Sequence, residues 1–433
     1  MKKVVFVGAS KAFVPVSEIL EKEKKAEIVH WFFKEPKYDK ELEIAKNTTI
    51  QNYPSPITYN KIFEELPVFL NTFIRMRSAK GKTYYEYINI FNIFVNYVYN
   101  ILIKQKIDKI FFTNIPHNGI DYLVYVIAKN LNIPTILFYN NPLFADHFFY
   151  IYDINDFGYF NDIKPNLSVK YIHVPKSFKK DSVVKKAHNV NKRRYNCLRI
   201  LLQNIFKMCI GHRHYVSFSN ILEEFERCKT YKKFYKQAVD NVDMTKPYVF
   251  FALHLQPELH TSTLGGIYND QVLAIEHLSQ IIPKDWMIYV KDHPQQIFFQ
   301  RDEYFFKRLK QVPNVVYLSD VANTYNLMQS AQLVSTITGT AGWEAITGGK
   351  KVLIFGKSWY RSLPGVFEFK SDINFEQIMA YEIDHNELEE KYNLLREKLR
   401  EGTTNSDYNN FVDSFDDLLN AKKICTCIEE ELM

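Results

Sequence analysis

The chain has 433 residues, which is too many for one small core and predicts two or three domains. Hydrophobic residues make up 46% and charged residues 24%, as is ordinary for a folded soluble protein. The net charge of +6 fits an anionic substrate or an acidic membrane surface without indicating a nucleic-acid partner. Five cysteines without regular spacing disfavour a disulfide framework or a zinc site, and they favour a reducing cytoplasm.

The first half of the sequence has the pattern of a parallel α/β sheet. An apolar run at 4–7 ends in Gly-Ala-Ser, as a buried strand does when it leads into a helix, and a second strand is expected at 27–33. Residues 108–140 then alternate strand, loop, helix and strand, which is a β-α-β unit. The N-terminal apolar run is too short for a signal peptide, and no stretch approaches the roughly 18–20 apolar residues of a membrane span.

Residues 185–240 form a strongly basic stretch that is expected to be helical, with Lys192, Arg193 and Arg194 in succession. Cationic and aromatic side chains of this kind can lie on an anionic bilayer. A solvated helix between two domains would show the same pattern, so both interpretations stay open.

A second α/β half follows the basic stretch. The strands expected in it are 247–253, 286–292, 315–320, 331–337 and 350–356. An amphipathic helix with acid–base pairs four residues apart is expected at 385–400. The predicted organisation is an N-terminal domain at 1–240 that includes the basic stretch, a C-terminal domain at 241–400 and a helical tail at 401–433. The predicted fold class is α/β, with two Rossmann-like domains that face a central cleft.

Open α/β sheets bind ligands at the loops that leave the carboxyl ends of their strands. The first such loop in the second half reads LHLQPELHTSTLGG and holds Gln256 and Glu258 among imidazoles and hydroxyls. A carboxylate in these surroundings suits a general base or a nucleophile. The alternative is that Glu258 only caps a helix N-terminus.

The next loop reads VKDHPQQ and begins directly after a strand. Pro294 biases the backbone of His293 towards an extended conformation at the strand end. We therefore expect His293, with Lys291 and Asp292 beside it, to bind a phosphate or to protonate a leaving group.

The stretch STITGTAGWEAI, residues 335–346, is expected to run from the end of the strand 331–337 into a short helix, with Thr338–Gly342 as the connecting turn. Amides at a helix N-terminus bind anions, and Gly339 and Gly342 would let a phosphate approach the main chain. Glu344 is placed in the first turn of that helix, from where it could accept hydrogen bonds from two ribose hydroxyls. A plain strand-to-helix turn would use the same residues, and from this loop alone the two interpretations are close to even.

Two further loops complete the predicted site. FGKSWYRSLPGV places Ser358 and its aromatic neighbours where a base or a sugar could stack, and NIPHNG places His117 and Asn118 at a strand end of the first half. A surface-loop histidine is the alternative for His117. The sequence has no Asp-x-Asp suited to a metal-bound sugar nucleotide, no Walker loop, no Gly-x-Gly-x-x-Gly and no His-Glu-x-x-His, so no metal ligand is predicted.

Taken together, KDHP and the later STITGTAGWEAITGGKKVLIFGKSWY resemble the bacterial capsule polysaccharide biosynthesis family. This family includes Kdo transferases and is similar in style to bacterial sialyltransferases, which carry a His-Pro and a Ser/Thr motif. The stretch LHLQPE followed by TSTLGG matches surface-glycan members, and the whole resemblance covers residues 247–367. It implies a GT-B architecture whose C-terminal domain binds a nucleotide sugar, which is a CMP-sugar in the members that use nonulosonic acids.

By that resemblance, His293 would contact the donor phosphate and Glu344 the ribose. Glu258 would be the nearest counterpart of the family's catalytic Asp, although its distance from Gln256 departs from the family's spacing. The remaining residues expected to bind the donor are Gln256, Lys291, Pro294, Ser335, Thr336, Thr338, Gly339, Thr340, Gly342 and Ser358. His117 and Asn118 are expected on the acceptor side, and no cofactor or metal is predicted.

The predicted protein is a metal-independent glycosyltransferase that moves an acidic nonulosonic sugar, of the Kdo or sialic-acid type, from a CMP-sugar to a growing glycan or glycolipid. Glu258 would activate the acceptor hydroxyl or attack the anomeric carbon, and His293 with residues 338–342 would stabilise the departing phosphate. One alternative is a UDP-sugar transferase or non-hydrolysing epimerase of the same architecture, and another is a non-catalytic glycan-binding partner of assembly or export. The expected location is the cytoplasm, either in solution or peripherally on the inner membrane face through residues 185–240.

Overall fold

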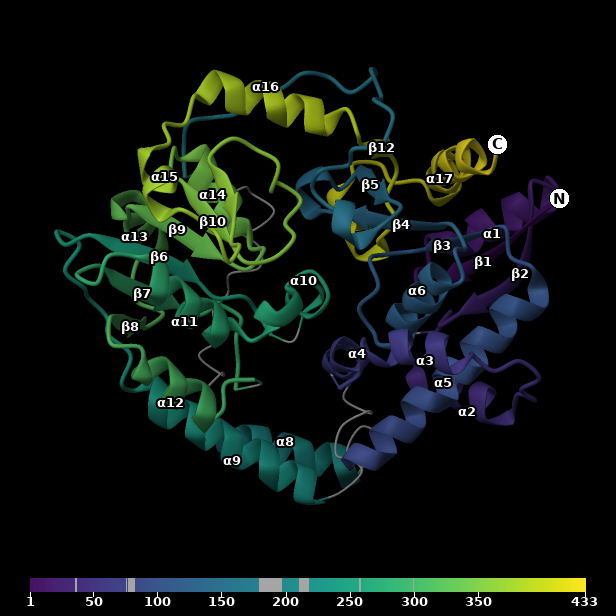
Figure 1. Cartoon of the computed structure of the whole chain (residues 1–433), viewed down its shortest axis with the longest axis horizontal. Coiled ribbons are helices and arrows are strands. Elements are labelled where there is room, and N and C mark those ends of the chain that lie inside the picture. Colours follow the sequence, from purple (N-terminus) through teal and green to yellow (C-terminus); the bar gives the residue numbers. More distant parts are fainter. Residues whose placement is uncertain are drawn as a thin grey trace. The chain divides into compact units, whose positions relative to one another are not determined.

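The structure is a computed structural model that describes the chain except for residues 36, 75, 77–81, 179–196, 210–217, 257 and 299. The chain divides into two compact units, one made of Met1–Lys170 and Leu394–Met433 and the other of Tyr171–Asn393 (Figure 1). This division differs from the expected domain limits. The described part of 171–240 groups with the second half, and the C-terminal segment groups with the N-terminal unit.

The first unit contains a six-stranded sheet with the strand order β12-β5-β4-β3-β1-β2. Its strands are β1 (Lys2–Val7), β2 (Ala26–Phe32), β3 (Lys109–Phe112), β4 (Thr135–Asn140), β5 (His147–Ile151) and β12 (Arg400–Glu401). The pairs β1–β2, β1–β3 and β3–β4 are parallel, whereas β5 and β12 join antiparallel. The last four residues of β1 are buried, which agrees with its unbroken apolar run and its pairing on both sides.

The helices of the first unit are α1 (Phe13–Lys22), α2 (Tyr38–Asn47), α3 (Pro56–Phe63), α4 (Leu66–Phe73), α5 (Tyr84–Gln105), α6 (Ile120–Asn130) and α17 (Asp417–Leu432), with 3-10 turns η2 (Pro142–Phe144), η3 (Ile154–Asp156) and η6 (Ser406–Phe411). Helix α5 begins with a capping box, in which Thr83 Oγ1 accepts from Glu86 N and the Glu86 carboxylate accepts from Thr83 N. Helix α17 packs against α1, so the C-terminal segment completes the N-terminal unit.

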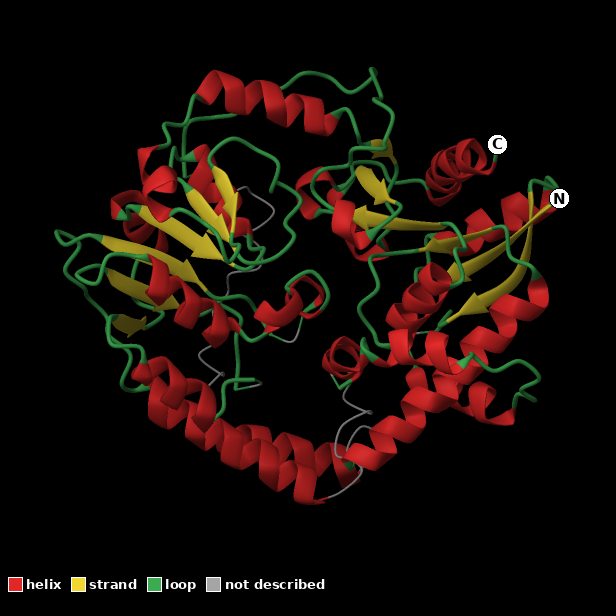
Figure 2. Cartoon of the chain, viewed as in Figure 1, coloured by secondary structure: helices red, strands yellow, loops and turns green. Residues whose placement is uncertain are grey.

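The second unit contains a six-stranded sheet with the order β11-β10-β9-β6-β7-β8, in which every pair is parallel (Figure 2). Its strands are β6 (Tyr248–Ala252), β7 (Met287–Lys291), β8 (Val315–Leu318), β9 (Leu333–Thr336), β10 (Val352–Ile354) and β11 (Val366–Glu368). Its helices are α8 (Cys197–Cys209), α9 (Phe218–Tyr235), α10 (Leu259–Ser262), α11 (Gln271–Ile281), α12 (Glu303–Gln311), α13 (Thr324–Ser330), α14 (Thr340–Thr347), α15 (Phe375–Ala380) and α16 (His385–Arg396), which begins in this unit, and the 3-10 turn η5 is Gly266–Asn269.

The strand order creates a switch point between β6 and β9. From β6 the chain proceeds to β7 and β8 on one side, and from β9 it proceeds to β10 and β11 on the other. The crossover helices therefore diverge at the carboxyl ends of β6 and β9, which is where open α/β sheets form a ligand crevice. Buried Val249 and Phe251 of β6, with Leu333 of β9, belong to the apolar core beneath this point.

The expected α/β class with two Rossmann-like units is confirmed, because each unit has a largely parallel sheet with connecting helices. The expected central cleft between the units stays a prediction. Within the described residues, no helix is both long enough and apolar enough to cross a bilayer.

Candidate functional site

The loops that follow β6 and β9 meet at the switch point through His254. Thr338 N donates a hydrogen bond to His254 Nε2 at 3.0 Å, and His254 is buried. Because Nε2 accepts this bond, a neutral imidazole here carries its proton on Nδ1. The backbone of His254 is held as well, since its N–H donates to Gln271 Oε1 at 2.8 Å and its carbonyl accepts from Gln271 Nε2 at 3.2 Å.

Gly339 lies directly against this histidine. A Cβ at position 339 would stand 3.0 Å from His254 Nε2 and 2.8 Å from Thr336 Oγ1, which is closer than real side chains normally come. The close approach of the two loops therefore requires glycine at this position. The approach of a phosphate to the main chain at Gly339 stays a prediction.

A buried ion pair lies beneath the same loops. Arg301 Nε donates to Asp292 Oδ1 at 3.0 Å, and the two side chains are 0% and 2% exposed. The guanidinium also donates from Nη1 to Gln256 Oε1 at 2.6 Å and from Nη2 to the carbonyl of His254 at 3.1 Å. One side chain thus ties the loop after β6 to the loop after β7. A buried charge is tolerated only with such a set of partners, because an isolated buried ion is strongly destabilising.

The second oxygen of Asp292 is also engaged. Asp292 Oδ2 accepts from Tyr317 Oη at 2.5 Å and from Tyr231 Oη at 3.5 Å. Burial, and then the neighbouring Asp292 charge, raises the pKa of Tyr317 well above its usual value, so this phenol keeps its proton and remains a donor. Arg301 stacks on the ring of Phe305 with 4.5 Å from its guanidinium carbon to the ring centre. Asp292 is therefore an orienting group within the protein.

His293 follows this ion pair immediately in the chain and is half-buried. Gln295 N donates to His293 Nδ1 at 3.2 Å, and the His293 carbonyl accepts from Gln296 N at 2.8 Å across the turn that contains Pro294. A neutral ring that accepts at Nδ1 carries its proton on Nε2, and an imidazole Nε2–H is a suitable donor to a phosphate oxygen. The role of His293 stays a prediction, and this geometry supports it.

Glu258 is half-buried and lies directly before the short helix α10. Its carbonyl accepts from Ser262 N at 3.1 Å and from Thr261 Oγ1 at 3.2 Å, which is the backbone pattern of a residue that begins a helix. The position agrees with both interpretations of this residue, a capping position and a carboxylate presented beside the switch point. Its catalytic role stays a prediction.

The hydroxyls of Ser335 and Thr336 are used inside the sheet. Ser335 Oγ donates to the carbonyl of Leu353 at 3.0 Å, and Thr336 Oγ1 donates to the carbonyl of Ala252 at 2.9 Å. Both residues are fully buried. This geometry favours a structural role over the donor contacts expected from the sequence. Thr340, in contrast, is exposed at the first position of α14.

Two expectations about α14 change. A Cβ at Gly342 would stand 2.2 Å from Tyr360 Oη, so the space beside this glycine is filled by Tyr360, whose hydroxyl donates to the carbonyl of Gly339. Glu344 is the fifth residue of α14, and the first turn contains no acidic residue, so its expected place in the first turn is wrong. Its contact with the ribose stays a prediction that the helix dipole no longer supports.

Lys291 and Gln256 have partners within the fold. Lys291 Nζ donates to the carbonyl of Ala322 at 2.6 Å and to Thr324 Oγ1 at 3.1 Å, which secures the loop between β8 and α13. Gln256 Nε2 donates to the carbonyl of Asn269 at 2.6 Å, and its Oε1 accepts from Arg301. These contacts favour a supporting role for both residues, and their predicted contact with the donor stays untested.

A cavity of about 230 Å³ lies beside the loop after β10. The rings of Tyr268, Phe355 and Phe369 line it, together with the ion pair between Arg361 Nη1 and Glu368 Oε2 at 3.2 Å. Aromatic faces with one charged pair are typical of a small-molecule pocket. Ser358, in the same loop, is buried, and its predicted contact with a base or a sugar stays untested.

In the first unit, His117 and Asn118 lie in the loop between β3 and α6. The Asp121 carboxylate accepts from the backbone N–H of His117 at 2.9 Å and of Asn118 at 2.7 Å, and His117 Nδ1 lies 2.7 Å from the carbonyl of Ile115. A Cβ at Gly119, which has φ +80°, would stand 2.9 Å from Phe73 Cβ. The loop is therefore held rigidly at the carboxyl end of β3, where an acceptor contact is expected to lie.

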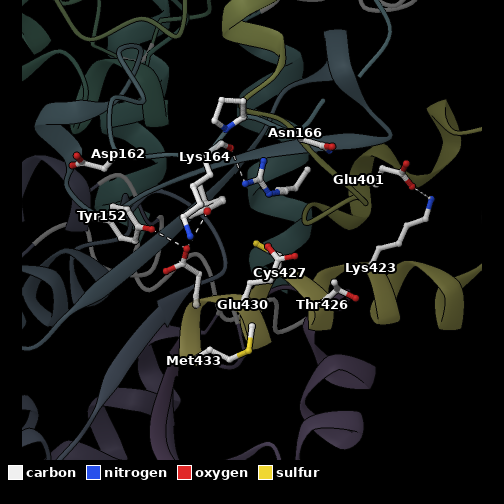
Figure 3. Close-up of a pocket in the computed structure, with 14 residues that line it drawn as sticks. Tyr152, Asp162, Lys164, Asn166, Glu401, Lys423, Thr426, Cys427, Glu430 and Met433 are labelled. Atoms are coloured by element: carbon white, nitrogen blue, oxygen red, sulfur yellow. Dashed lines mark hydrogen bonds and ion pairs between the residues drawn. The ribbon is translucent and has the colours of Figure 1, made fainter. Parts of the chain in front are cut away.

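A larger cavity of about 730 Å³ lies elsewhere in the first unit (Figure 3). Tyr152 Oη donates to Glu431 Oε1 at 2.8 Å, and Glu401 pairs with Lys423 at 2.8 Å on its wall. Tyr152 follows β5, which is antiparallel to β4, so this cavity lies at the amino ends of the parallel strands. It is therefore separate from the loop of His117.

Two of the residues that shape the site, His254 and Arg301, were not among the predicted site residues. His254 closely follows the apolar strand β6, and this position was a usable signal. Arg301 had none, because it reaches partners 45 and 47 residues away in the chain. Tyr360, an aromatic neighbour of Ser358, was expected to stack on a base or a sugar, whereas it is fully buried and its hydroxyl donates to the carbonyl of Gly339. Within the described ranges, no group of three or more His, Cys, Asp or Glu side chains is placed to hold a metal ion.

A parallel α/β unit whose loops converge at a switch point defines a Rossmann-like binding unit, a class that commonly holds nucleotides. Residues 170–378, which contain all of these strands, match the protein family described as "Capsule polysaccharide biosynthesis protein". No curated protein matches the chain.

Among solved structures, the chain is similar to two transferases of KpsC from Thermosulfurimonas dismutans. The beta Kdo 2,7 transferase has 8% sequence identity and a TM-score of 0.37, with 100% of each chain covered. The beta Kdo 2,4 transferase has 11% identity and a TM-score of 0.32, with 75% of this chain and 87% of that chain covered. A UDP-GlcNAc 2-epimerase from Methanocaldococcus jannaschii has 14% identity and a TM-score of 0.25, with 99% and 100% covered. With TM-scores below 0.5, these likenesses carry no argument about activity.

Proposed function

We propose that the protein is a glycosyltransferase of capsule or other surface-glycan biosynthesis that binds a nucleotide sugar on its second unit. The observation that carries this proposal is the convergence of three strand-end loops at the switch point. His254 and Thr338 join the loops after β6 and β9, and Arg301 with Asp292 joins the loops after β6 and β7. The match of residues 170–378 to the capsule polysaccharide biosynthesis family supports a role in glycan assembly.

The proposed donor is a CMP-activated acidic nonulosonic sugar of the Kdo or sialic-acid type. His293 would donate from Nε2 to a phosphate oxygen of this donor, and the N-terminal turn of α14 would add the positive end of its helix dipole. Both contacts grow stronger as negative charge develops on the departing nucleotide, which is how such a site would accelerate transfer. The absence of an Asp-x-Asp motif from the sequence supports a mechanism without a metal cofactor.

On the acceptor side, the proposed substrate is a growing glycan or glycolipid whose hydroxyl attacks the anomeric carbon. Glu258 would take the proton of that hydroxyl as a general base or, in a retaining variant, attack the anomeric carbon itself. His117 and Asn118 of the first unit are proposed to contact the acceptor. The protein would act in the cytoplasm or peripherally at the inner membrane face.

A thermal-shift panel of CMP, CDP, UMP, UDP, GDP and ADP tests the donor, because a ligand stabilises the folded state according to its affinity. We expect CMP to raise the melting temperature most. A response to UDP without one to CMP would indicate the UDP-sugar transferase or epimerase. No response to any nucleotide would favour a non-catalytic glycan-binding protein.

Glu258→Gln and His293→Ala test the catalytic assignment in a transfer assay. We expect both variants to keep the fold and to lose activity by about 100-fold or more, the usual size of a general-base or charge-stabilising contribution. His293→Ala should also weaken CMP binding, whereas Glu258→Gln should leave it nearly unchanged. Normal transfer by both variants would show that the site is assigned wrongly.

A further inference from the structure

The cavity of about 730 Å³ in the first unit has no role in the proposed transfer reaction. Its volume lies within the roughly 300–1,000 Å³ that is usual for small-molecule sites. Three parts of the chain supply most of its lining: the loop after β5 at residues 162–166, the strand β12, and the part of α17 from Lys423 onwards. Lys164 of the loop lies on one side of the cavity and Thr426 of α17 on the other (Figure 3).

Hydrogen bonds between these parts hold the walls of the cavity together. Tyr152 Oη donates to Glu431 Oε1 at 2.8 Å, which joins the residues after β5 to α17. Arg400 Nη2 donates to the carbonyl of Lys164 at 2.9 Å, which joins β12 to the loop. The cavity is therefore formed by the fold itself, and a ligand does not have to order its walls.

The side chains that line the cavity carry charges of both signs in nearly equal number, three basic and four acidic. Glu401 and Lys423 form an ion pair at 2.8 Å. Asp162, Lys164 and Glu430 are exposed, and none of them forms an ion pair with another residue in the described part of the chain. A nucleotide phosphate in this cavity would face four carboxylates, and a cationic ligand would face three basic groups. The lining therefore favours a ligand without net charge.

Arg400 supplies several donors to the cavity. Its Nη2 and Nη1 donate to the carbonyls of Lys164 and Leu399, and its guanidinium carbon lies 5.5 Å from the ring centre of Tyr150. No carboxylate of the described residues pairs with it, so the other N–H groups of the planar fork can donate to a ligand. A sugar hydroxyl can accept from such a group while it donates to a carboxylate such as that of Glu430. A hydroxyl-rich ligand therefore uses both kinds of side chain at once.

We propose that this cavity binds an uncharged, hydroxyl-rich carbohydrate, namely a neutral section of the growing glycan. Carboxylates of the lining accept from its hydroxyls, while Arg400 and Lys164 donate to them. The inference rests on the proposed function only in identifying this carbohydrate as part of the growing glycan. Because the cavity lies at the amino ends of the parallel strands, away from the loop of His117, it holds a section of the glycan that does not react.

The test is binding of the full chain to an array of immobilised neutral and acidic oligosaccharides. Thr426→Trp fills the cavity from α17, and the double variant Asp162→Ala with Glu430→Ala removes two acceptors. All three residues are exposed, so we expect melting temperatures close to that of the native protein. We expect the native protein to bind neutral oligosaccharides, and both variants to bind them about tenfold more weakly or worse, because charge-assisted hydrogen bonds or the space for the sugar are lost.

Leu418→Trp is the matched control, because Leu418 is 56% exposed, lies about two turns before Thr426 on α17 and is not part of the lining. This control should bind as the native protein does. Native binding by Thr426→Trp, binding of acidic oligosaccharides alone, or no binding by the native protein would overturn the inference. Thr426→Trp should still transfer sugar to a short soluble acceptor. Glycan binding without a response to any nucleotide would contradict the proposed function alone, and the reverse would contradict this inference alone.

Discussion

Arg301 and Asp292 are fully buried beneath the strand ends of the second unit. Charged side chains are rarely buried to this extent. Their hydrogen bonds to the His254 carbonyl and to Tyr317 leave each charge with several partners. The pair can hold the loops after β6 and β7 in register, because neither loop can move without leaving a buried ion unpaired in an apolar surrounding. We therefore regard Arg301 as a positioning residue.

Arg301→Met should lower the free energy of unfolding of the second unit by about 3–5 kcal/mol, because it leaves the Asp292 charge buried without its cation. Arg308→Met is the matched control, since Arg308 pairs with Asp270 and Glu276 but is 37% exposed, and its loss should be about 1 kcal/mol or less. Urea unfolding of both variants measures the difference. Similar losses for the two arginines would contradict the role given to Arg301.

His30 makes the stability of the first unit depend on pH. Burial lowers the pKa of His30 from 6.5 to about 4, and its Nε2 lies 3.2 Å from Tyr97 Oη, which in turn donates to Glu41. The pKa of His30 is lower in the folded state than in the unfolded state. The stability that the neutral, buried His30 contributes is therefore fully present above pH 6.5, and it is lost as the pH falls towards 4. It amounts to at most about 3 kcal/mol.

His30→Gln should remove this part of the acid sensitivity while keeping a polar partner for Tyr97. Burial raises the pKa of Glu41, which shifts stability in the opposite direction, so the informative quantity is the difference between native and variant unfolding curves from pH 7 to pH 4. His173→Gln, at an exposed histidine, is the control. A difference that stays constant with pH would show that His30 does not titrate in this range.

Among the elements of the second unit, we expect the hydroxyls of β9 to stabilise the sheet and the turn before α14 to bind the nucleotide. Ser335→Ala should cost about 1 kcal/mol of stability, because it removes the hydrogen bond to Leu353, and it should leave CMP affinity unchanged. Gly339→Ala should instead weaken CMP binding, because its methyl group would press on His254 and displace the turn. Urea unfolding and calorimetric titration with CMP separate the two effects. A large loss of CMP affinity in Ser335→Ala would restore the role expected from the sequence.

The strands of the second unit were predictable because they are short apolar runs bounded by turn residues. The expected strand at 331–337 corresponds to β9 at Leu333–Thr336, and the strand at 247–253 corresponds to β6 at Tyr248–Ala252. The partners of the Ser335 and Thr336 side chains were not predictable from the sequence. Both were expected at the end of the strand 331–337 with hydroxyls that bind the donor, whereas these hydroxyls donate to the neighbouring strands β10 and β6.

Contacts that are distant in the sequence were also beyond prediction. The C-terminal segment is part of the first unit, because β12 pairs with β5 and α17 packs against α1. From the sequence, the segment was expected to be a separate tail. A two-residue strand such as Arg400–Glu401 has too little pattern to be recognised. The contacts of Arg301 were not predictable for the same reason, because its partners come together only when the sheet is formed.

At the scale of the whole molecule, the chain combines two α/β units of similar design. The segment that matches the capsule polysaccharide biosynthesis family, residues 170–378, covers nearly all of the second unit and almost none of the first. We would expect this pattern if the matched unit binds the proposed donor and the other unit contacts a variable acceptor. We therefore propose that a nucleotide binds at the switch point of the second unit.

Hydrogen–deuterium exchange of the full chain with and without CMP tests this claim most directly. We expect slower exchange in the loops after β6, β7 and β9, at residues 253–258, 292–296 and 337–342, because a bound nucleotide suppresses local opening of the segments that hold it. Exchange around the cavity of Tyr152 and Glu431 in the first unit should not change. Protection confined to that cavity, or no protection in the three loops at a CMP concentration that stabilises the protein, would contradict the account.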